Sequence, residues 1–196
     1  MIKLNLPNKE EKDKIAFIIE NVFSIEECNE LIQRTEKQGY IQAQVNVGNG
    51  KEVTMTDYRN SLRCIIDDEL LASVIFNRIE QYLPKFIRNK PVVCMNERLR
   101  FLKYLPGHFF KPHYDGNYIR DDKSEVSYLT IQLYLNEGSI GGATRFYDRY
   151  DMDNYIDVIP KTGLILVFQH DIYHEGTAVN EGVKYVMRSD IMYNNK

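Results

Sequence analysis

The stretch Arg98-Leu-Arg-Phe-Leu-Lys-Tyr-Leu-Pro-Gly-His-Phe-Phe-Lys-Pro-His-Tyr-Asp115 contains the features that best predict the fold. Its first eight residues, Arg98–Leu105, mix apolar and polar side chains in the way typical of a strand with one buried face. Pro106 and Gly107 then break the strand and predict a turn. The stretch ends in His-Tyr-Asp, which puts two polar, potentially metal-binding side chains just beyond strand structure.

Similar short segments fill the rest of the second half of the chain. They are Val126–Leu135, Ala143–Tyr147, Tyr155–Ile159, Leu164–Phe168 and Lys184–Tyr193, with turn residues between them. Many short strands at near-regular spacing predict an antiparallel sandwich or barrel. The acidic stretch Asp148–Asp157 lacks the central Gly and the closing Glu of a calcium loop, so we expect a solvated loop there.

The first half of the chain is expected to be mainly helical. Ser24 and the glutamate three residues later form a capping box, and Gly39 ends the apolar repeat that follows. A second helix is predicted from about Asp68, and Pro84 ends it. A short strand is plausible at Ile15–Val22. We therefore predict an α+β fold in a single domain, 1–196, with 1–95 as mainly helical support and 96–196 as the strand-rich core.

Composition narrows the class of protein. The net charge of −3 gives no overall basic surface for nucleic acid, so a nucleic-acid partner is not favoured. The N-terminus has no unbroken apolar segment, and no stretch is long enough to cross a bilayer, so we expect neither a secretory signal nor a membrane partner. Cys28, Cys64 and Cys94 form no CxxC pair and are expected to be reduced thiols. These features predict a cytoplasmic protein.

Three residues form a candidate metal site. His113 and Asp115 are two apart, and side chains two apart in an extended chain point the same way. His174 follows a predicted apolar strand and could add a third ligand. Two histidines and one carboxylate form the ligand set of non-heme iron(II) oxygenases, which keep other metal positions open. A lone His-x-Asp is common by chance. The other two histidines, His108 and His170, show no pattern of potential partners, and we expect them to be structural or exposed.

Several cations could lie near this site. Lys184 and Arg188 are four apart in a predicted strand and share a face; if that face is buried, they need an anion such as a dicarboxylate. The alternative is that one or both are solvated. Arg98 and Arg100 likewise either line the cavity or are exposed strand charges. The polar stretch Tyr58–Arg63 either reaches the cavity mouth or forms a capped loop before a helix.

Residues 98–193 resemble the catalytic domain of the 2-oxoglutarate/iron(II) dioxygenases, in particular its prolyl 4-hydroxylase-like branch. The resemblance is carried by the segments Leu99–Gly107, Phe110–Asp115, Tyr128–Asn136, Gly141–Phe146, His174–Gly176 and Gly182–Tyr185. It implies a double-stranded β-helix, or jelly-roll, of antiparallel strands with N-terminal helices packed on the major sheet.

The resemblance also implies roles for single residues. Iron would be bound by His113, Asp115 and His174. Lys184 stands where prolyl 4-hydroxylases place the lysine that binds the C5 carboxylate of 2-oxoglutarate, and Arg188 could share or replace that role. The co-substrate would also contact the hydroxyl groups of two tyrosines, Tyr104 and Tyr134.

The implied activity is hydroxylation with Fe(II), 2-oxoglutarate and O₂, with release of succinate and CO₂; ascorbate is a further cofactor to expect. Asp115 separates the chain from halogenases of this fold, which lack the carboxylate. The chain has no tryptophan, and Asp190 stands about where collagen-type prolyl hydroxylases carry one, so peptidyl proline is only one candidate substrate.

Two alternatives to a peptide hydroxylase stay open at the level of the sequence. The first is an oxygenase of the same fold that acts on a small molecule or a nucleic acid. The second is a non-catalytic jelly-roll binding module, because a fold does not determine a function. The oligomeric state is not decided by any feature of the sequence.

Overall fold

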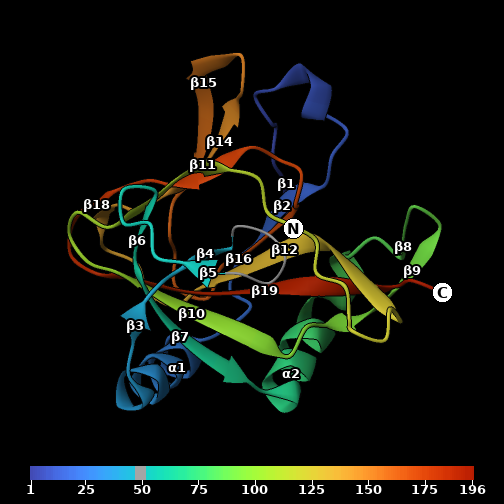
Figure 1. Cartoon of the computed structure of the whole chain (residues 1–196), viewed down its shortest axis with the longest axis horizontal. Helices are drawn as coiled ribbons and strands as arrows, with labels where there is room; N and C mark the ends of the chain where they lie inside the picture. The colour runs from blue at the N-terminus through green and yellow to red at the C-terminus, as the bar shows by residue number, and fades with distance from the viewer. Residues whose placement is uncertain (47–51) are drawn as a thin grey trace.

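The structure is a computed structural model that describes residues 1–46 and 52–196. Two antiparallel β-sheets face each other, and two helices pack on the outer side of the larger sheet (Figure 1). This is the double-stranded β-helix with bracing helices that the family resemblance implies. None of the described helices has the length and apolarity needed to span a membrane.

The major sheet contains most of the strands. In spatial order they are β1 (Ile2–Lys3), β2 (Ala16–Ile19), β16 (Ile165–Gln169), β12 (Glu125–Tyr134), β19 (Lys184–Asn194), β10 (Arg98–Tyr104), β7 (Leu62–Asp67) and β3 (Ile41–Gln42). The end of β19 also pairs with β9 (Lys90–Met95), which pairs with β8 (Phe86–Ile87). β12, β19 and β10 lie side by side at the centre of this sheet, and their shared inner face forms one wall of the site.

The minor sheet is smaller and forms the opposite wall. Its order is β15 (Asp151–Val158), β14 (Thr144–Asp148), β17 (His174–Gly176), β11 (Phe109–His113) and β6 (Arg59–Asn60). Two further pairs are β13 (Ile140–Gly141) with β18 (Val179–Glu181), and β4 (Val45–Asn46) with β5 (Glu52–Val53).

The helices begin where the sequence predicts. α1 (Ile25–Gln38) is capped by Ser24, whose hydroxyl accepts a hydrogen bond from the Glu27 N–H at 3.2 Å, while the Glu27 carboxylate accepts one from the Ser24 N–H at 2.9 Å. α2 (Glu69–Ile79) is capped by Asp68. The 3₁₀ turns η1 (Lys9–Glu11) and η2 (Glu80–Tyr82) complete the helical segments.

The core has two layers because strand residues alternate between the faces of the major sheet. Odd-numbered residues of β10, β12 and β19, such as Phe101, Ile131 and Met187, pack against the helices in the larger hydrophobic cluster. Even-numbered residues, such as Leu102 and Tyr134, face the minor sheet in a second cluster. The polar residues of the site are interspersed in this second layer.

Two sequence predictions need correction. The acidic stretch Asp148–Asp157, expected to be a loop, is mostly the strand β15, which forms a hairpin with β14. Its acidic residues are exposed on an edge strand, where charge indicates solvent exposure rather than the absence of a strand. Residues 1–95, expected to be mainly helical, also contribute strands to the major sheet, notably β2, β7 and β9.

Candidate active site

His113, Asp115 and His174 meet between the two sheets. His113 ends β11 and His174 begins β17, and the two residues are direct partners across these antiparallel strands. Asp115 is held just after β11 by a 2.9 Å hydrogen bond from its N–H to the carbonyl of His170. One potential ligand atom from each of the three residues lies within 4.8 Å of the others. The structure thus brings together the three residues that the sequence selects.

The two imidazole rings are oriented for metal binding. Nδ1 of His113 lies 2.7 Å from the Lys111 carbonyl, and Nδ1 of His174 lies 2.9 Å from the Ile172 carbonyl. Because a carbonyl only accepts hydrogen bonds, Nδ1 of each ring carries the proton and Nε2 keeps a free lone pair. Burial, followed by the nearby His174, lowers the pKa of His113 to about 3, and burial lowers the pKa of His174. Both rings are therefore neutral, as metal ligands must be.

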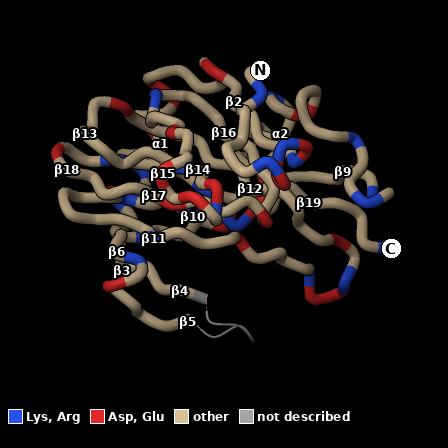
Figure 2. Tube along the Cα trace, turned by 90° about the horizontal axis from the view of Figure 1, so that it is seen from above, with Lys and Arg blue, Asp and Glu red and all other residues tan. Residues whose placement is uncertain are grey.

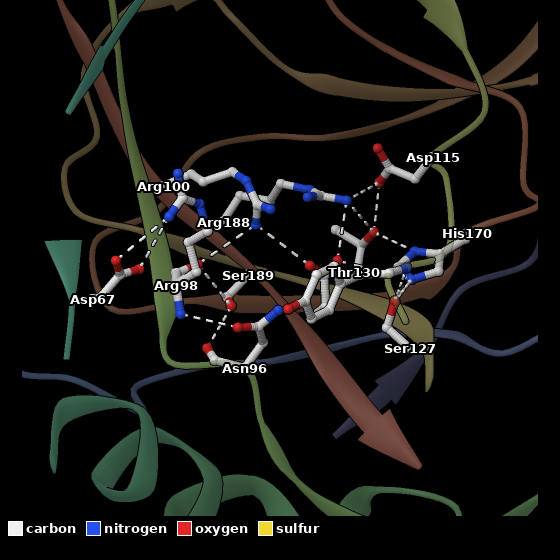
Figure 3. Close-up of polar contacts among 12 residues, drawn as sticks. Asp67, Asn96, Arg98, Arg100, Asp115, Ser127, Thr130, His170, Arg188 and Ser189 are labelled. Atoms are coloured by element: carbon white, nitrogen blue, oxygen red, sulfur yellow. Dashed lines mark hydrogen bonds and ion pairs between the residues drawn. The ribbon is translucent and has the colours of Figure 1, made fainter. Parts of the chain in front are cut away.

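The Asp115 carboxylate is held by a buried polar network (Figure 3). The Thr130 hydroxyl donates to Oδ2 of Asp115, and Arg188 Nη2 lies 3.2 Å from the same oxygen. Since Thr130 uses its proton on Asp115, the His170 ring must donate from Nδ1 to Thr130, at 2.9 Å. Ser127 then donates to His170 Nε2 at 2.9 Å. Burial raises the pKa of Asp115, but the charge of the adjacent Arg188 outweighs that effect, so the pKa lies well below its usual range.

The network explains the position of His170, which the sequence left as structural or exposed. It is buried and lies one hydrogen bond from the residue that orients Asp115. Burial lowers the pKa of His170 despite the nearby Asp190 and Asp115, so the ring is neutral. We assign it a structural role behind the candidate metal site. In the sequence, the only signal for this role is that His170 stands four residues before His174, and such a spacing between two histidines is not specific for a metal site.

A cavity of about 570 Å³ opens beside the three residues, in the size range of small-molecule sites. Both sheets line it, and Lys184 lies at its inner wall. The Lys184 ammonium lies 5.0 Å from the ring centroid of Tyr104 and 5.5 Å from that of Tyr134. Within residues 1–46 and 52–196, Lys184 has neither a carboxylate partner nor a side-chain hydrogen bond. Burial lowers its pKa to about 7, which reflects the missing counter-charge.

Arg188 lies on the same face but differs in its partners. Its Nη2 contacts Asp115 and also Oδ1 of Asp190 at 3.1 Å. Arg100, directly opposite Arg188 on β10, shares Asp190 at 3.4 Å. Asp190 is thus the anion between two arginines. Arg98 does not line the cavity: it is exposed and pairs with Asp67 at 3.4 Å.

Tyr134 also belongs to a polar chain. Its hydroxyl donates to Thr144 at 2.7 Å, and Thr144 donates to Gln132 at 2.9 Å. Both Thr144 and Gln132 line the cavity. Burial raises the pKa of Tyr104 and of Tyr134, so both hydroxyls keep their protons. Of the predicted co-substrate residues, Tyr104, Lys184 and Arg188 line this cavity, and Tyr134 lies buried behind it, next to Lys184.

The polar stretch Tyr58–Arg63 reaches the cavity and is not a simple loop. Tyr58, Arg59 and Arg63 line the cavity, and Arg59 lies in β6 beside Phe110 of β11. The two-residue length of β6 leaves no periodicity for a sequence pattern to detect. Placing Arg59 at the site thus requires the tertiary structure.

The comparisons with known proteins agree with this geometry. Residues 99–189 match the model of the 2OG-Fe(II) oxygenase superfamily. A prolyl-4-hydroxylase from Pseudomonas putida has a similar structure, with a TM-score of 0.64 at 18% identity over 95% of this chain and 96% of that one. No curated protein matches the sequence.

Two further solved structures carry ligands. One is a prolyl hydroxylase from Trichoplax adhaerens in complex with a peptide fragment of hypoxia inducible factor. Its TM-score is 0.71 at 15% identity, covering 97% of this chain and 88% of that one. The other, HygX from Streptomyces hygroscopicus, has nickel and 2-oxoglutarate bound. Its TM-score is 0.59 at 13% identity, over 95% of this chain and 85% of that one. These likenesses establish the fold, and residues 99–189 match the 2OG-Fe(II) oxygenase superfamily, as the sequence motifs indicated.

Proposed function

We propose that this protein is an Fe(II)- and 2-oxoglutarate-dependent dioxygenase that hydroxylates an organic substrate. The observation that carries the proposal is the pairing of two features in one cavity. One is a cluster of two neutral imidazoles and a carboxylate. The other is a buried ammonium, that of Lys184, without an anionic partner among the described residues. A cluster of metal ligands next to a buried ammonium suits a chelating dicarboxylate.

The donor set fits iron(II). His113 and His174 would each supply Nε2, because Nδ1 of each ring is used by a backbone carbonyl. Asp115 would supply Oδ1, because Oδ2 already accepts from Thr130 and lies against Arg188. Three protein ligands leave positions for a co-substrate and O₂, and the carboxylate leaves no place for the chloride that a halogenase binds.

Lys184 is the better candidate for the co-substrate anchor. Arg188 already has Asp115 and Asp190 as partners, whereas Lys184 would gain its first anion from the C5 carboxylate. Tyr104 and Tyr134 flank the ammonium, and Tyr104, which lines the cavity, would place its protonated hydroxyl beside the co-substrate. A buried unpaired charge is costly, so a carboxylate that balances it would bind strongly.

The residues of the chain would orient the reaction, and the cofactors would supply the oxidation. Bound Fe(II) with 2-oxoglutarate and O₂ supplies the oxidising power, and the co-substrate leaves as succinate and CO₂. Thr130 and Arg188 hold the carboxylate of Asp115 in one orientation. The apolar neighbours Phe146 and Phe168, which are buried, exclude water behind His174. Ascorbate as an auxiliary reductant belongs to the same proposal.

The finer proposal is that the substrate is a peptidyl residue such as proline. It is supported by the fold shared with prolyl hydroxylases, one of which holds a peptide in its solved structure. A small-molecule substrate is the competing class. The competing class is favoured by the charged lining of the cavity, which includes Asp190.

A succinate-release screen tests the function. Purified protein with Fe(II), 2-oxoglutarate and ascorbate would be incubated with peptides, amino acids and nucleic acids, with ascorbate omitted in a parallel series. We expect stimulated succinate release with at least one peptide or small molecule. Binding of 2-oxoglutarate without succinate release under any condition would instead identify a non-catalytic binding module.

A further inference from the structure

The cavity carries an excess of basic side chains. Among the described residues that line it, five are basic (Arg59, Arg63, Arg100, Lys184 and Arg188) and three are acidic (Asp115, Glu175 and Asp190). The chain as a whole has the opposite sign, with a net charge of −3. In Figure 2 a blue segment lies next to the label of β6, the strand that contains Arg59. Fe(II) and 2-oxoglutarate have equal and opposite charges, so their binding would leave this excess unchanged.

Two of these cations have acidic partners that balance them. Arg188 contacts Asp115 and Asp190, and Arg100 shares Asp190. Lys184 would receive the co-substrate under the proposed function, on which the present inference rests. Like charges directly opposite each other on neighbouring strands are unfavourable, so Asp190 is needed simply to keep Arg100 and Arg188 together. Asp190 thus has no charge to spare for another cation.

Arg59 has only neutral contacts among the described residues. Its Nε donates to the Ser61 hydroxyl at 3.4 Å and its Nη1 donates to the Gln44 carbonyl at 3.2 Å. The guanidinium also lies 4.6 Å from the ring centroid of Phe110. Burial lowers the pKa of Arg59, yet an arginine stays charged at any physiological pH. The two hydrogen bonds leave other N–H groups of the fork available.

The position of Arg59 connects it to the metal site. It pairs with Phe110 across β6 and β11, and the Phe110 ring stacks on His113 with centroids 3.7 Å apart. Arg59, Phe110 and His113 thus form one stack, and the guanidinium is a single ring away from a candidate metal ligand. A group bound to Arg59 would be held next to the reaction centre.

We propose that the primary substrate presents a carboxylate to Arg59, with Arg100 as a second cation on the opposite wall of the cavity. A carboxylate matches the planar guanidinium fork and can accept two hydrogen bonds from it. Its single charge also matches that of Arg59, whose hydrogen bonds among the described residues go to neutral groups, whereas a phosphate would bring up to two charges. The substrate class is therefore an acidic peptide or amino acid that carries the carboxylate close to the hydroxylated carbon.

Matched acid and amide probes test this proposal. The probes are the N-acetyl amides of aspartate, asparagine, glutamate, glutamine and phosphoserine. Their binding would be measured by calorimetry, without O₂, on protein loaded with Fe(II) and 2-oxoglutarate, so that Lys184 is already occupied. We expect at least one acid to bind about tenfold or more tightly than its amide, the usual size of a charge-assisted hydrogen bond.

Three variants locate the effect. Arg59→Gln should remove the preference for the acid, and Arg59→Lys should retain part of it. Arg149→Gln is the matched control, because Arg149 is exposed in the β14–β15 hairpin and does not line the cavity. Binding of 2-oxoglutarate, measured first in each variant, should be unchanged by all three.

The outcomes separate this inference from the proposed function. Equal binding of acids and amides to protein that binds 2-oxoglutarate would overturn the acidic-substrate proposal and leave the proposed function intact. An acid preference that survives Arg59→Gln would overturn the assignment to Arg59. Tighter binding of the phosphoserine probe than of the carboxylates would replace the carboxylate by a phosphate. Failure of the wild-type protein to bind 2-oxoglutarate would overturn the proposed function itself.

Discussion

Lys184 and Arg188 project from the same face of β19 into one cavity, but among the described residues only Arg188 contacts a carboxylate. The difference arises from position along the strand. Arg188 lies opposite Gln132 and Arg100, close to Asp115 and Asp190, whereas Lys184 lies opposite Tyr104, between two aromatic rings. Two cations that are equivalent by spacing therefore have different roles, one within a polar network and one open to a ligand.

Replacing Lys184 by methionine should abolish high-affinity binding of 2-oxoglutarate and stabilise the ligand-free protein. Burial lowers the pKa of Lys184 from 10.5 to about 7, so its charged form destabilises the fold. That cost is fully present below about pH 7 and disappears as the pH rises toward the unfolded-state value. Thermal unfolding should show a higher midpoint for Lys184→Met, with a larger gain at pH 6 than at pH 9.

Lys161→Met is the matched control, because Lys161 is an exposed residue paired with Glu20 on the surface. It should change neither the midpoint nor the binding of 2-oxoglutarate. A midpoint for Lys184→Met that is lower than wild type at both pH values would show that the ammonium is not a buried, uncompensated charge.

The affinity of the wild-type protein for 2-oxoglutarate should fall as the pH rises above about 7. Lys184 loses its proton in this range when the cavity is empty, so binding the dianion then requires uptake of a proton. Below this pH the ammonium is already charged and its contribution is constant. The candidate metal ligands do not complicate the trend, since both imidazoles are already neutral. Calorimetry in two buffers of different ionisation enthalpy measures both effects; constant affinity without proton uptake would contradict the account.

Thr130→Val should weaken iron(II) binding by about tenfold to a hundredfold, the usual effect of losing a hydrogen bond to a metal-binding side chain. The substitution removes the hydroxyl that donates to Asp115 and accepts from His170. Thr130→Ser keeps the hydroxyl and should restore most of the affinity. Iron dissociation constants from anaerobic titration make the comparison, and wild-type affinity in Thr130→Val would show that the network does not orient Asp115.

Gly163→Ala should destabilise the fold far more than Gly138→Ala. Both glycines have positive φ, at +74° and +89°, so the backbone strain of an alanine is similar in the two variants. Only at Gly163 would the new Cβ lie 2.0 Å from a backbone atom, the carbonyl oxygen of Phe23. This contact joins the chain before α1 to the start of β16. Equal losses in the thermal midpoint would contradict this close packing.

The parts of the fold that the sequence predicts well are those where one local pattern determines the structure. The alternation in β10, β12 and β19 places Tyr104, Tyr134 and Lys184 on one face because side chains alternate in any strand. The capping box at Ser24 marks the start of α1 because it satisfies backbone N–H groups that any helix leaves free.

The parts that the sequence misses depend on contacts between distant segments. β6 is too short for a pattern, so Arg59 reaches the site only through its pairing with β11. His170 gains its place in the network from hydrogen bonds with Ser127 and Thr130, which are 43 and 40 residues away in the sequence. The end of β15 lies within the predicted strand Tyr155–Ile159, but the charged residues of its first half indicate only exposure, and their strand conformation comes from pairing with β14.

The most direct test of the central claim is the visible absorption of the anaerobic protein after addition of Fe(II) and 2-oxoglutarate. Chelation of iron by the keto acid in this site should produce a metal-to-ligand charge-transfer band. The band should be absent in His174→Ala and unchanged in His108→Gln, because His108 lies outside the cluster and the cavity. Absence of the band in the wild-type protein, or its full retention in His174→Ala, would contradict the assignment of this site to iron and 2-oxoglutarate.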